Sequence, residues 1–117
     1  MKEVIAIIRP GRWTATKRKL IEAGFSYTQC RVFGRGRQKG LRYLAASKNG
    51  TTAECGITYF PKRFIILAVP DERVDEAVGT LIEANRTGEI GDGKIFVSPM
   101  ETAVRIRTRE SGAAAVA

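Results

Sequence analysis

The sequence contains no histidine and only two cysteines among its 117 residues. Without histidine, the chain cannot build a histidine-containing metal site or a serine–histidine triad, and it has no histidine to act as a general acid or base. Cys30 and Cys55 form no CxxC motif, and a chain with an ordinary core needs no disulfide. We therefore expect two free thiols in a cytoplasmic protein.

Long apolar runs are missing as well. No stretch approaches the roughly 20 apolar residues of a membrane-spanning helix, and the first residues lack the cleavage site of a signal peptide. Hydrophobic residues make up 44% and charged residues 27%, which is an ordinary globular balance for one domain. A core of this size is modest, so we expect self-association to supplement it.

Acidic residues are scarce relative to basic ones. Twenty lysines and arginines face 12 aspartates and glutamates, which gives a net charge of +8 and an isoelectric point near 10.0. This excess predicts an anionic partner, whether a nucleotide phosphate, a nucleic acid or an acidic protein surface. Charge alone does not choose among these, and a solvated basic face is an equally simple interpretation.

The order of elements predicts an α+β fold. Apolar runs at 4–8, 64–69 and 95–97, with a weaker one at 25–33, indicate strands. Helices are expected over 13–23, with Trp13, Leu20 and Ile21 facing inward, and after Pro70, where apolar residues recur at helical spacing. The repeated order of strand, helix and strand predicts a βαββαβ ferredoxin-like sandwich, an antiparallel sheet with two helices on one face.

Three segments complete this prediction of a single domain over residues 1–117. A long loop joins the second and third strands over about 36–56, and loops of that length are usually functional. Val104 and Ile106 alternate with Arg105 and Arg107 in a last extended piece. Residues 111–117 are expected to be frayed.

Glycines cluster with cations in two places. Glycines at 88, 91 and 93 allow a ligand to approach the backbone closely and to meet several N–H groups, with Lys94 as a positive charge for phosphate. This is not a Walker A loop, because a strand follows Lys94 where a helix should. A helix cap at Gly88 and a turn at Asp92-Gly93 explain the same residues without a ligand. The second cluster, Gly34 to Gly40, suits phosphate contact or a solvated hinge equally well.

Arg105 and Arg107 lie two positions apart on a predicted strand and therefore on one face of it. Two guanidinium groups side by side suit a triphosphate, although a polar face on an edge strand explains them as well.

Taken together, these segments resemble the PII signal-transduction family of nitrogen regulators over residues 1–110. The glycine-rich run is the most specific of the segments that carry the resemblance. They are Ala6-Ile7-Ile8-Arg9-Pro10, Gly36-Arg37-Gln38-Lys39-Gly40, Pro61-Lys62, Val69-Pro70-Asp71, the run from Thr87 to Val97, and Arg105-Ile106-Arg107-Thr108.

The resemblance implies a trimer of ferredoxin-like subunits that binds ATP or ADP in the clefts between them and is a regulator rather than an enzyme. The long loop corresponds to the family's T-loop, which changes shape with ligand and docks onto a target protein. The residues implied to hold the nucleotide come from three segments, the last from the neighbouring subunit: Gly36, Arg37 and Gln38; Thr87, Ile90, Gly91, Asp92, Gly93 and Lys94; and Arg105 and Arg107. Those implied for 2-oxoglutarate are Gln38, Lys39 and Lys62, and Gln38 also helps to hold a Mg²⁺ ion shared by ATP and 2-oxoglutarate.

Several strings resemble the nitrogenase-linked NifI branch most closely, among them Phe33 to Gly40 and Pro61 to Arg63. That branch implies an oligomer, either homomeric or mixed with a paralogue, that controls nitrogenase component one. The alternatives are another PII target, such as an ammonium transporter or an enzyme of nitrogen and carbon metabolism, and, more remotely, a small basic RNA-binding domain. The string typical of RNA-recognition sheets is absent, so we expect no nucleic-acid partner.

Overall fold

The computed structural model describes residues 1–36, 42–46, 52–56 and 59–117, and for 42–46 and 52–56 it describes the backbone alone. Three residues of the predicted site, Arg37, Gln38 and Lys39, lie outside these ranges.

The described chain forms strands, helices and two short 3₁₀ turns. The strands are β1 (Lys2–Ile8), β2 (Thr28–Gly34), β3 (Arg42–Ala46), β4 (Thr52–Gly56), β5 (Phe60–Val69) and β6 (Lys94–Pro99). The helices are α1 (Trp13–Glu22), α2 (Val74–Asn85) and α3 (Ala113–Val116), and the 3₁₀ turns are η1 (Pro10–Arg12) and η2 (Asp71–Arg73).

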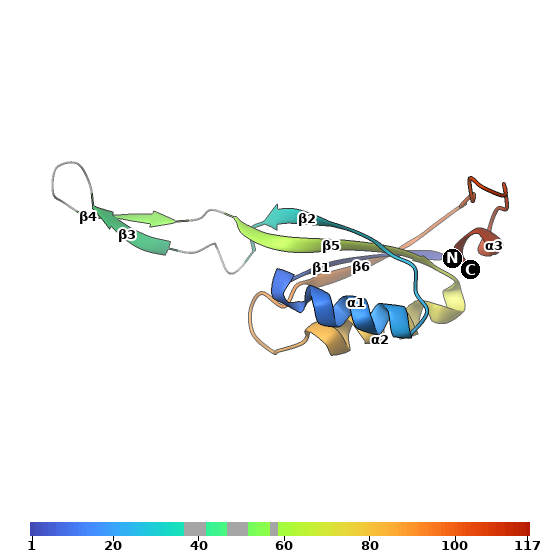
Figure 1. The fold of residues 1–117 in the computed structure, drawn as a ribbon, viewed down its shortest axis with the longest axis horizontal. Coiled ribbons are helices and arrows are strands. Elements are labelled where there is room, and N and C mark those ends of the chain that lie inside the picture. The colour runs from blue at the N-terminus through green and yellow to red at the C-terminus, as the bar shows by residue number, and fades with distance from the viewer. Residues whose placement is uncertain (37–41, 47–51, 57–58) are drawn as a thin grey trace.

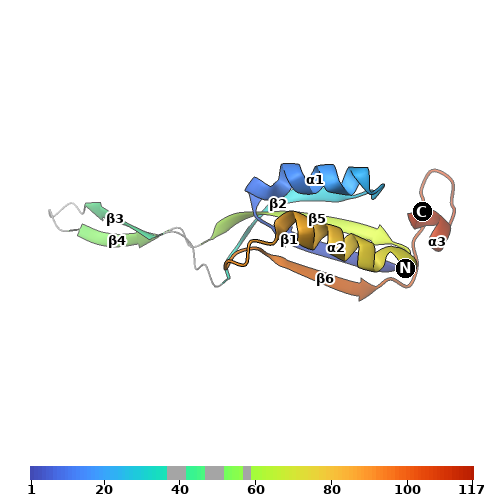
Figure 2. The same ribbon diagram turned by 90° about the horizontal axis from the view of Figure 1, so that it is seen from below.

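Four of the strands form an antiparallel sheet in the order β2-β5-β1-β6. Both long helices lie on one face of this sheet (Figures 1 and 2). Helix α1 lies over β2, and α2 lies over β1 and β6. This arrangement confirms the ferredoxin-like sandwich. The short hairpin of β3 and β4 belongs to the predicted T-loop and projects from the end of the sheet where β2 ends and β5 begins (Figure 1). No helix in the described part of the chain is long and apolar enough to cross a membrane.

The core lies between the sheet and the helices. Alternate residues of the two central strands point toward the helices and are buried, among them Val4 and Ile8 on β1 and Ile65 and Leu67 on β5. Leu20 of α1 and Leu81 of α2 pack onto them. The inward prediction is confirmed for Trp13, which is partly buried against this cluster, and for Leu20, but it is wrong for Ile21, whose side chain is 59% exposed. The buried stripe of α1 runs instead through Thr16 and Leu20, one helical turn apart.

The opposite face of the sheet carries no helix, yet its central residues are apolar. Ile66, Ile5 and Phe96 lie directly opposite one another across β5, β1 and β6, and Phe64 lies opposite Ile7 in the next such row. Half of the Phe96 side chain is exposed. An antiparallel sheet facing water normally carries polar residues on that side, so this face has the composition of a surface that another chain covers.

Cys30 continues the second of these rows on β2, opposite Phe64. It is a free thiol, as the sequence predicts, and it is exposed. The side chain of Cys55 lies outside the described part of the chain.

The expected strand over 104–107 does not form. Val104 makes only an isolated bridge to Ser111, and the chain turns at 106–108. Alternating residues make a strand only where another strand offers backbone partners, and Ile106, 96% exposed, has no surface to pack on within the described residues. Residues 113–116, expected to be frayed, form the short helix α3.

A buried hydrogen bond joins the two helices. The Asn85 side-chain amide of α2 donates to the Thr16 hydroxyl of α1 (3.0 Å) and to the Leu81 carbonyl (2.9 Å). The Thr16 hydroxyl in turn donates to the Arg12 carbonyl (2.7 Å). Thr16 is completely buried and Asn85 is 6% exposed, so water cannot replace either partner.

Replacing Thr16 with valine keeps the shape of the side chain but removes this acceptor. We expect Thr16→Val to lower the free energy of unfolding by about 1–3 kcal/mol, because a buried amide hydrogen of Asn85 loses its partner. Thr80→Val is the matched control, since the Thr80 hydroxyl makes the same kind of bond to the Glu76 carbonyl (2.8 Å) at an exposed position. That change should cost less than about 0.5 kcal/mol. Urea unfolding curves measure both, and equal losses would contradict the assignment.

Candidate functional site

A cleft of about 570 Å³ lies where the T-loop leaves the sheet. The end of β2 and the start of β5 form one wall, and the glycine-rich loop that leads into β6 forms the other. Several lining residues, Ile7, Lys62, Lys94 and Phe96, belong by register to the face of the sheet that carries no helix. A chain that covered this face would therefore also close over the cleft.

Gly93 anchors the glycine-rich loop to the end of β1. Its φ of +108° is one that side-chain-bearing residues rarely adopt, and a Cβ at this position would overlap the carbonyl oxygen of Ile7. Only glycine permits both this backbone angle and this close approach. The contact fixes where the loop enters β6, and so it fixes the position of Lys94, the next residue.

Asp92 holds the beginning of the same loop from inside. Its carboxylate accepts hydrogen bonds from the backbone N–H groups of Thr87 (2.8 Å) and Gly88 (2.9 Å), and from the Thr87 hydroxyl. These bonds lower the pKa of Asp92 to about 2, with the Thr87 hydroxyl contributing most. Asp92 is therefore ionised at neutral pH.

This geometry revises the predicted anion nest. The protein's own carboxylate takes up the N–H groups of Thr87 and Gly88, and the Thr87 hydroxyl accepts the N–H of Glu89 (3.1 Å). The part of the loop that lines the cleft is its second half, with Gly91, Gly93 and Lys94. The alternative cap at Gly88 is also wrong, because α2 ends earlier, at Asn85.

Arg9, which the sequence analysis did not single out as a site residue, ties the loop to the end of β1. Its guanidinium donates to the Ile90 carbonyl (2.7 Å) and lies 3.5 Å from the Asp92 carboxylate. In the sequence, Arg9 stands between a buried strand and Pro10, within one of the segments that carry the family resemblance. No pattern reveals that its side chain reaches a loop 81 positions away.

Lys62 crosses the cleft from β5. Its ammonium donates to the Gly91 carbonyl (3.2 Å) and lies 5.9 Å from the centre of the Phe60 ring, within the range of a cation–π contact. Burial lowers the pKa of Lys62, and the nearby charge of Arg9 lowers it further. Lys62, Arg9 and the exposed Lys94 thus give this end of the molecule a concentration of positive charge. Such an arrangement attracts anions.

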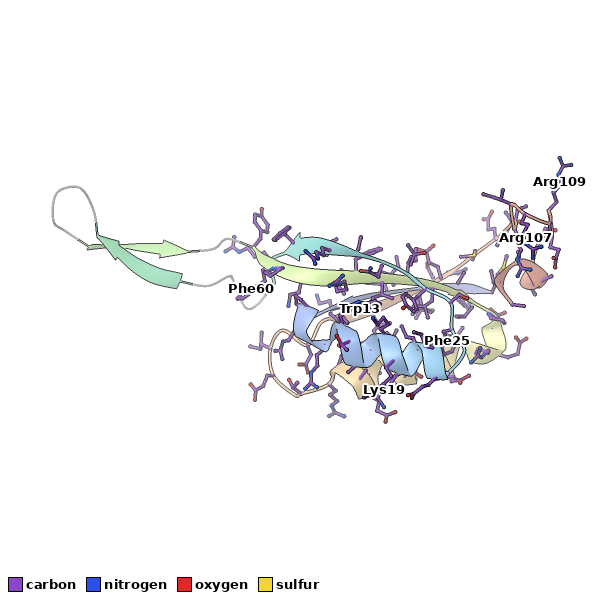
Figure 3. All side chains as sticks on the ribbon, viewed as in Figure 1. Trp13, Lys19, Phe25, Phe60, Arg107 and Arg109 are labelled. Carbon is purple, nitrogen blue, oxygen red and sulfur yellow. The ribbon has the colours of Figure 1, made fainter. Side chains whose placement is uncertain are left out.

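Arg107 lies at the opposite end of the sheet from the cleft. Figure 3 shows Arg107 and Arg109 beyond one end of the sheet and Phe60, which lines the cleft, at the other end. Arg105 precedes Arg107 by two residues in the same C-terminal segment. Within one subunit, the predicted arginine pair therefore cannot meet an anion held by Lys94. The neighbouring-subunit role that the family resemblance implies for these arginines is compatible with this separation.

The remaining predicted residues divide between the cleft and the undescribed part of the chain. Gly36 and Ile90 line the cleft with those already described, whereas Arg37, Gln38 and Lys39 are outside the described residues. The described residues contain no group of three or more acidic, cysteine or histidine side chains that would hold a metal ion.

The fold and the cleft define a ferredoxin-like sandwich with a cationic, glycine-lined cleft at the base of its long loop. Residues 1–110 match the family described as Nitrogen regulatory protein P-II. The chain belongs to this family, whose members are regulatory proteins, and it is a regulator rather than an enzyme.

Several relatives cover almost the whole chain. The nifHD region GlnB-like protein 2 of Methanobacterium ivanovii is 49% identical over 121 residues, which cover 99% of each chain. The protein of the same description from Methanothermococcus thermolithotrophicus is 43% identical, covering 99% of this chain and 98% of the relative. The Nitrogen regulatory protein P-II of Rhodobacter capsulatus is 45% identical, covering 99% and 100%.

A side chain at Gly93 should displace the loop from β1. We expect Gly93→Ala to lower the free energy of unfolding by about 2 kcal/mol or more, because the new Cβ overlaps the Ile7 carbonyl at a strained φ. Gly79→Ala is the matched control, since Gly79 lies within α2 with open space around it. That change should be neutral or stabilise the protein by up to about 1 kcal/mol. Denaturant unfolding distinguishes the two, and a loss no larger at Gly93 than at Gly79 would refute the anchor.

Proposed function

We propose that this chain is a cytoplasmic PII-type sensor that binds ATP or ADP together with 2-oxoglutarate and controls a target protein through its T-loop. The observation that carries the proposal is that Lys62 and Lys94 line a glycine-rich cleft at the base of that loop, with Arg9 bonded to the carbonyl of Ile90 in its wall. A bound phosphate chain would meet Lys94 and the backbone of Gly91 and Gly93. The T-loop begins at the same place, so an anion there would bias the loop's conformation.

The active form in this proposal is a trimer, homomeric or mixed with a paralogue. The apolar row of Ile66, Ile5 and Phe96 gives a reason for assembly, since covering it removes apolar surface from water. The separation of Arg105 and Arg107 from the cleft gives a second reason. With these arginines supplied by a neighbouring subunit, cations would surround the phosphates from both sides.

Regulation then requires linkage rather than catalysis. ATP with 2-oxoglutarate would favour one T-loop state and ADP another, and the target would bind only one of them. A coupling of about 1–3 kcal/mol between the sites is enough for a useful switch. In this proposal, Mg²⁺ held by Gln38 and the ligands neutralises charge between ATP and 2-oxoglutarate, and Lys39 and Lys62 bind the 2-oxoglutarate.

Nitrogenase component one is the target that we propose. The support is the description of relatives at 49% and 43% identity as nifHD region proteins of nitrogen fixation. The T-loop carries this target specificity in the proposal.

Calorimetric titration with Mg-ATP, with and without 2-oxoglutarate, tests the sensor. We expect ATP to bind, 2-oxoglutarate to tighten that binding, and Lys94→Ala to weaken it by about tenfold or more through loss of a charge-assisted contact. Lys17→Ala is the control, because Lys17 is an exposed lysine of α1 that does not line the cleft. ATP affinity that does not change with 2-oxoglutarate would support a nucleotide sensor but contradict 2-oxoglutarate sensing. Equal effects of the two substitutions on ATP affinity would exclude the cleft as the nucleotide site.

A further inference from the structure

The guanidinium group of Arg105 is held by the protein's own segment 110–117. One terminal nitrogen lies 3.4 Å from the Glu110 carboxylate. The other donates to the backbone carbonyls of Ala114 (3.2 Å) and Ala117 (3.4 Å). Three oxygen atoms from one short segment thus converge on a single arginine.

The backbone of the segment is arranged to make these contacts. The Arg105 N–H donates to the Glu110 carbonyl (2.8 Å), the Arg109 N–H donates to the Arg105 carbonyl (2.8 Å), and Val104 bridges to Ser111. The N–H of Gly112 then donates to the Ala103 carbonyl (3.0 Å). This closed turn brings α3 back over Arg105.

Arg105 and Arg107 therefore differ in what surrounds them. The Arg107 side chain is exposed and makes no hydrogen bond or ion pair with the residues that the structure describes. Arg105 is a partly buried cation, and both of its terminal nitrogens already donate to oxygens of segment 110–117. The carboxylate and the two carbonyls supply hydrogen-bond acceptor oxygens to the guanidinium group, as a phosphate group would. The same nitrogen atoms cannot serve both at full strength.

We propose that segment 110–117 is an internal competitor for the anion that Arg105 binds. The inference rests on the proposed function, in which Arg105 reaches the phosphates of a nucleotide in the neighbouring subunit's cleft. Nucleotide binding then requires the segment to release the guanidinium. About a third of the Arg105 side chain and 44% of the Glu110 side chain are exposed, so the hold is weak enough to reverse.

Removing the competitor should tighten nucleotide binding. A chain that ends at Gly112 keeps both hydrogen bonds of the Val104 bridge, from Arg105 to Glu110 and from Gly112 to Ala103, but loses the Ala114 and Ala117 carbonyls. We expect it to bind Mg-ATP about two- to fivefold more tightly in calorimetry. Glu110→Gln should tighten binding by about twofold. Glu101→Gln is the matched control, because it removes the same charge from an exposed carboxylate that does not contact Arg105, and it should leave the affinity unchanged.

Hydrogen exchange follows release of the segment directly. The amide of Gly112 is bonded to Ala103 in the closed turn, and Mg-ATP should raise its exchange rate. Unchanged or weaker ATP binding by the shortened chain would overturn the competitor while leaving the sensor intact, as would slower exchange at Gly112. Equal effects of the Glu110 and Glu101 changes would also overturn it. Absence of ATP binding in both the full and the shortened chain would overturn the proposed function and this inference together.

Discussion

The close approach of Gly93 to the Ile7 carbonyl is the constraint on which the rest of the site depends. It brings the glycine-rich loop against the end of β1, where Arg9 can bond to Ile90 and pair with Asp92. With both ends of the loop fixed, Lys62 can donate to Gly91 and Lys94 can line the same cleft. Cations that would otherwise repel one another are held together because backbone carbonyls and one carboxylate lie between them.

The second organising feature is the division of positive charge between the two ends of the subunit. The sheet separates the cleft from Arg105 and Arg107, and its helix-free face is apolar through Ile5, Ile66 and Phe96. In our account, assembly through that face brings the arginines of one subunit to the cleft of the next. It also buries the apolar rows. Association and ligand binding then use the same surface. Because only the assembled form would hold the complete site, a nucleotide would stabilise the oligomer that binds it.

The sequence predicted the sandwich because each of its elements has a strong local pattern. The β-branched run of β1 and the helical stripe of α2 can each be recognised from residues that are close together in the sequence. The glycine-rich loop was also identified, but Arg9 was missed, because its contacts join residues far apart in the chain. The strand expected at Val104 does not form for a related reason: its residues alternate correctly, but the described part of the chain offers it only the isolated bridge to Ser111. Tertiary contacts decide both cases.

Subunit mixing tests most directly whether one site is built from two chains. Lys94→Ala and Arg105→Ala subunits are unfolded and refolded together, and Mg-ATP binding is compared with that of each variant refolded alone. In a mixed trimer, one interface joins an intact Lys94 to an intact Arg105, so we expect the mixture to regain binding sites of wild-type affinity that neither variant has alone. Binding by the mixture no better than the average of the two variants would contradict a shared site.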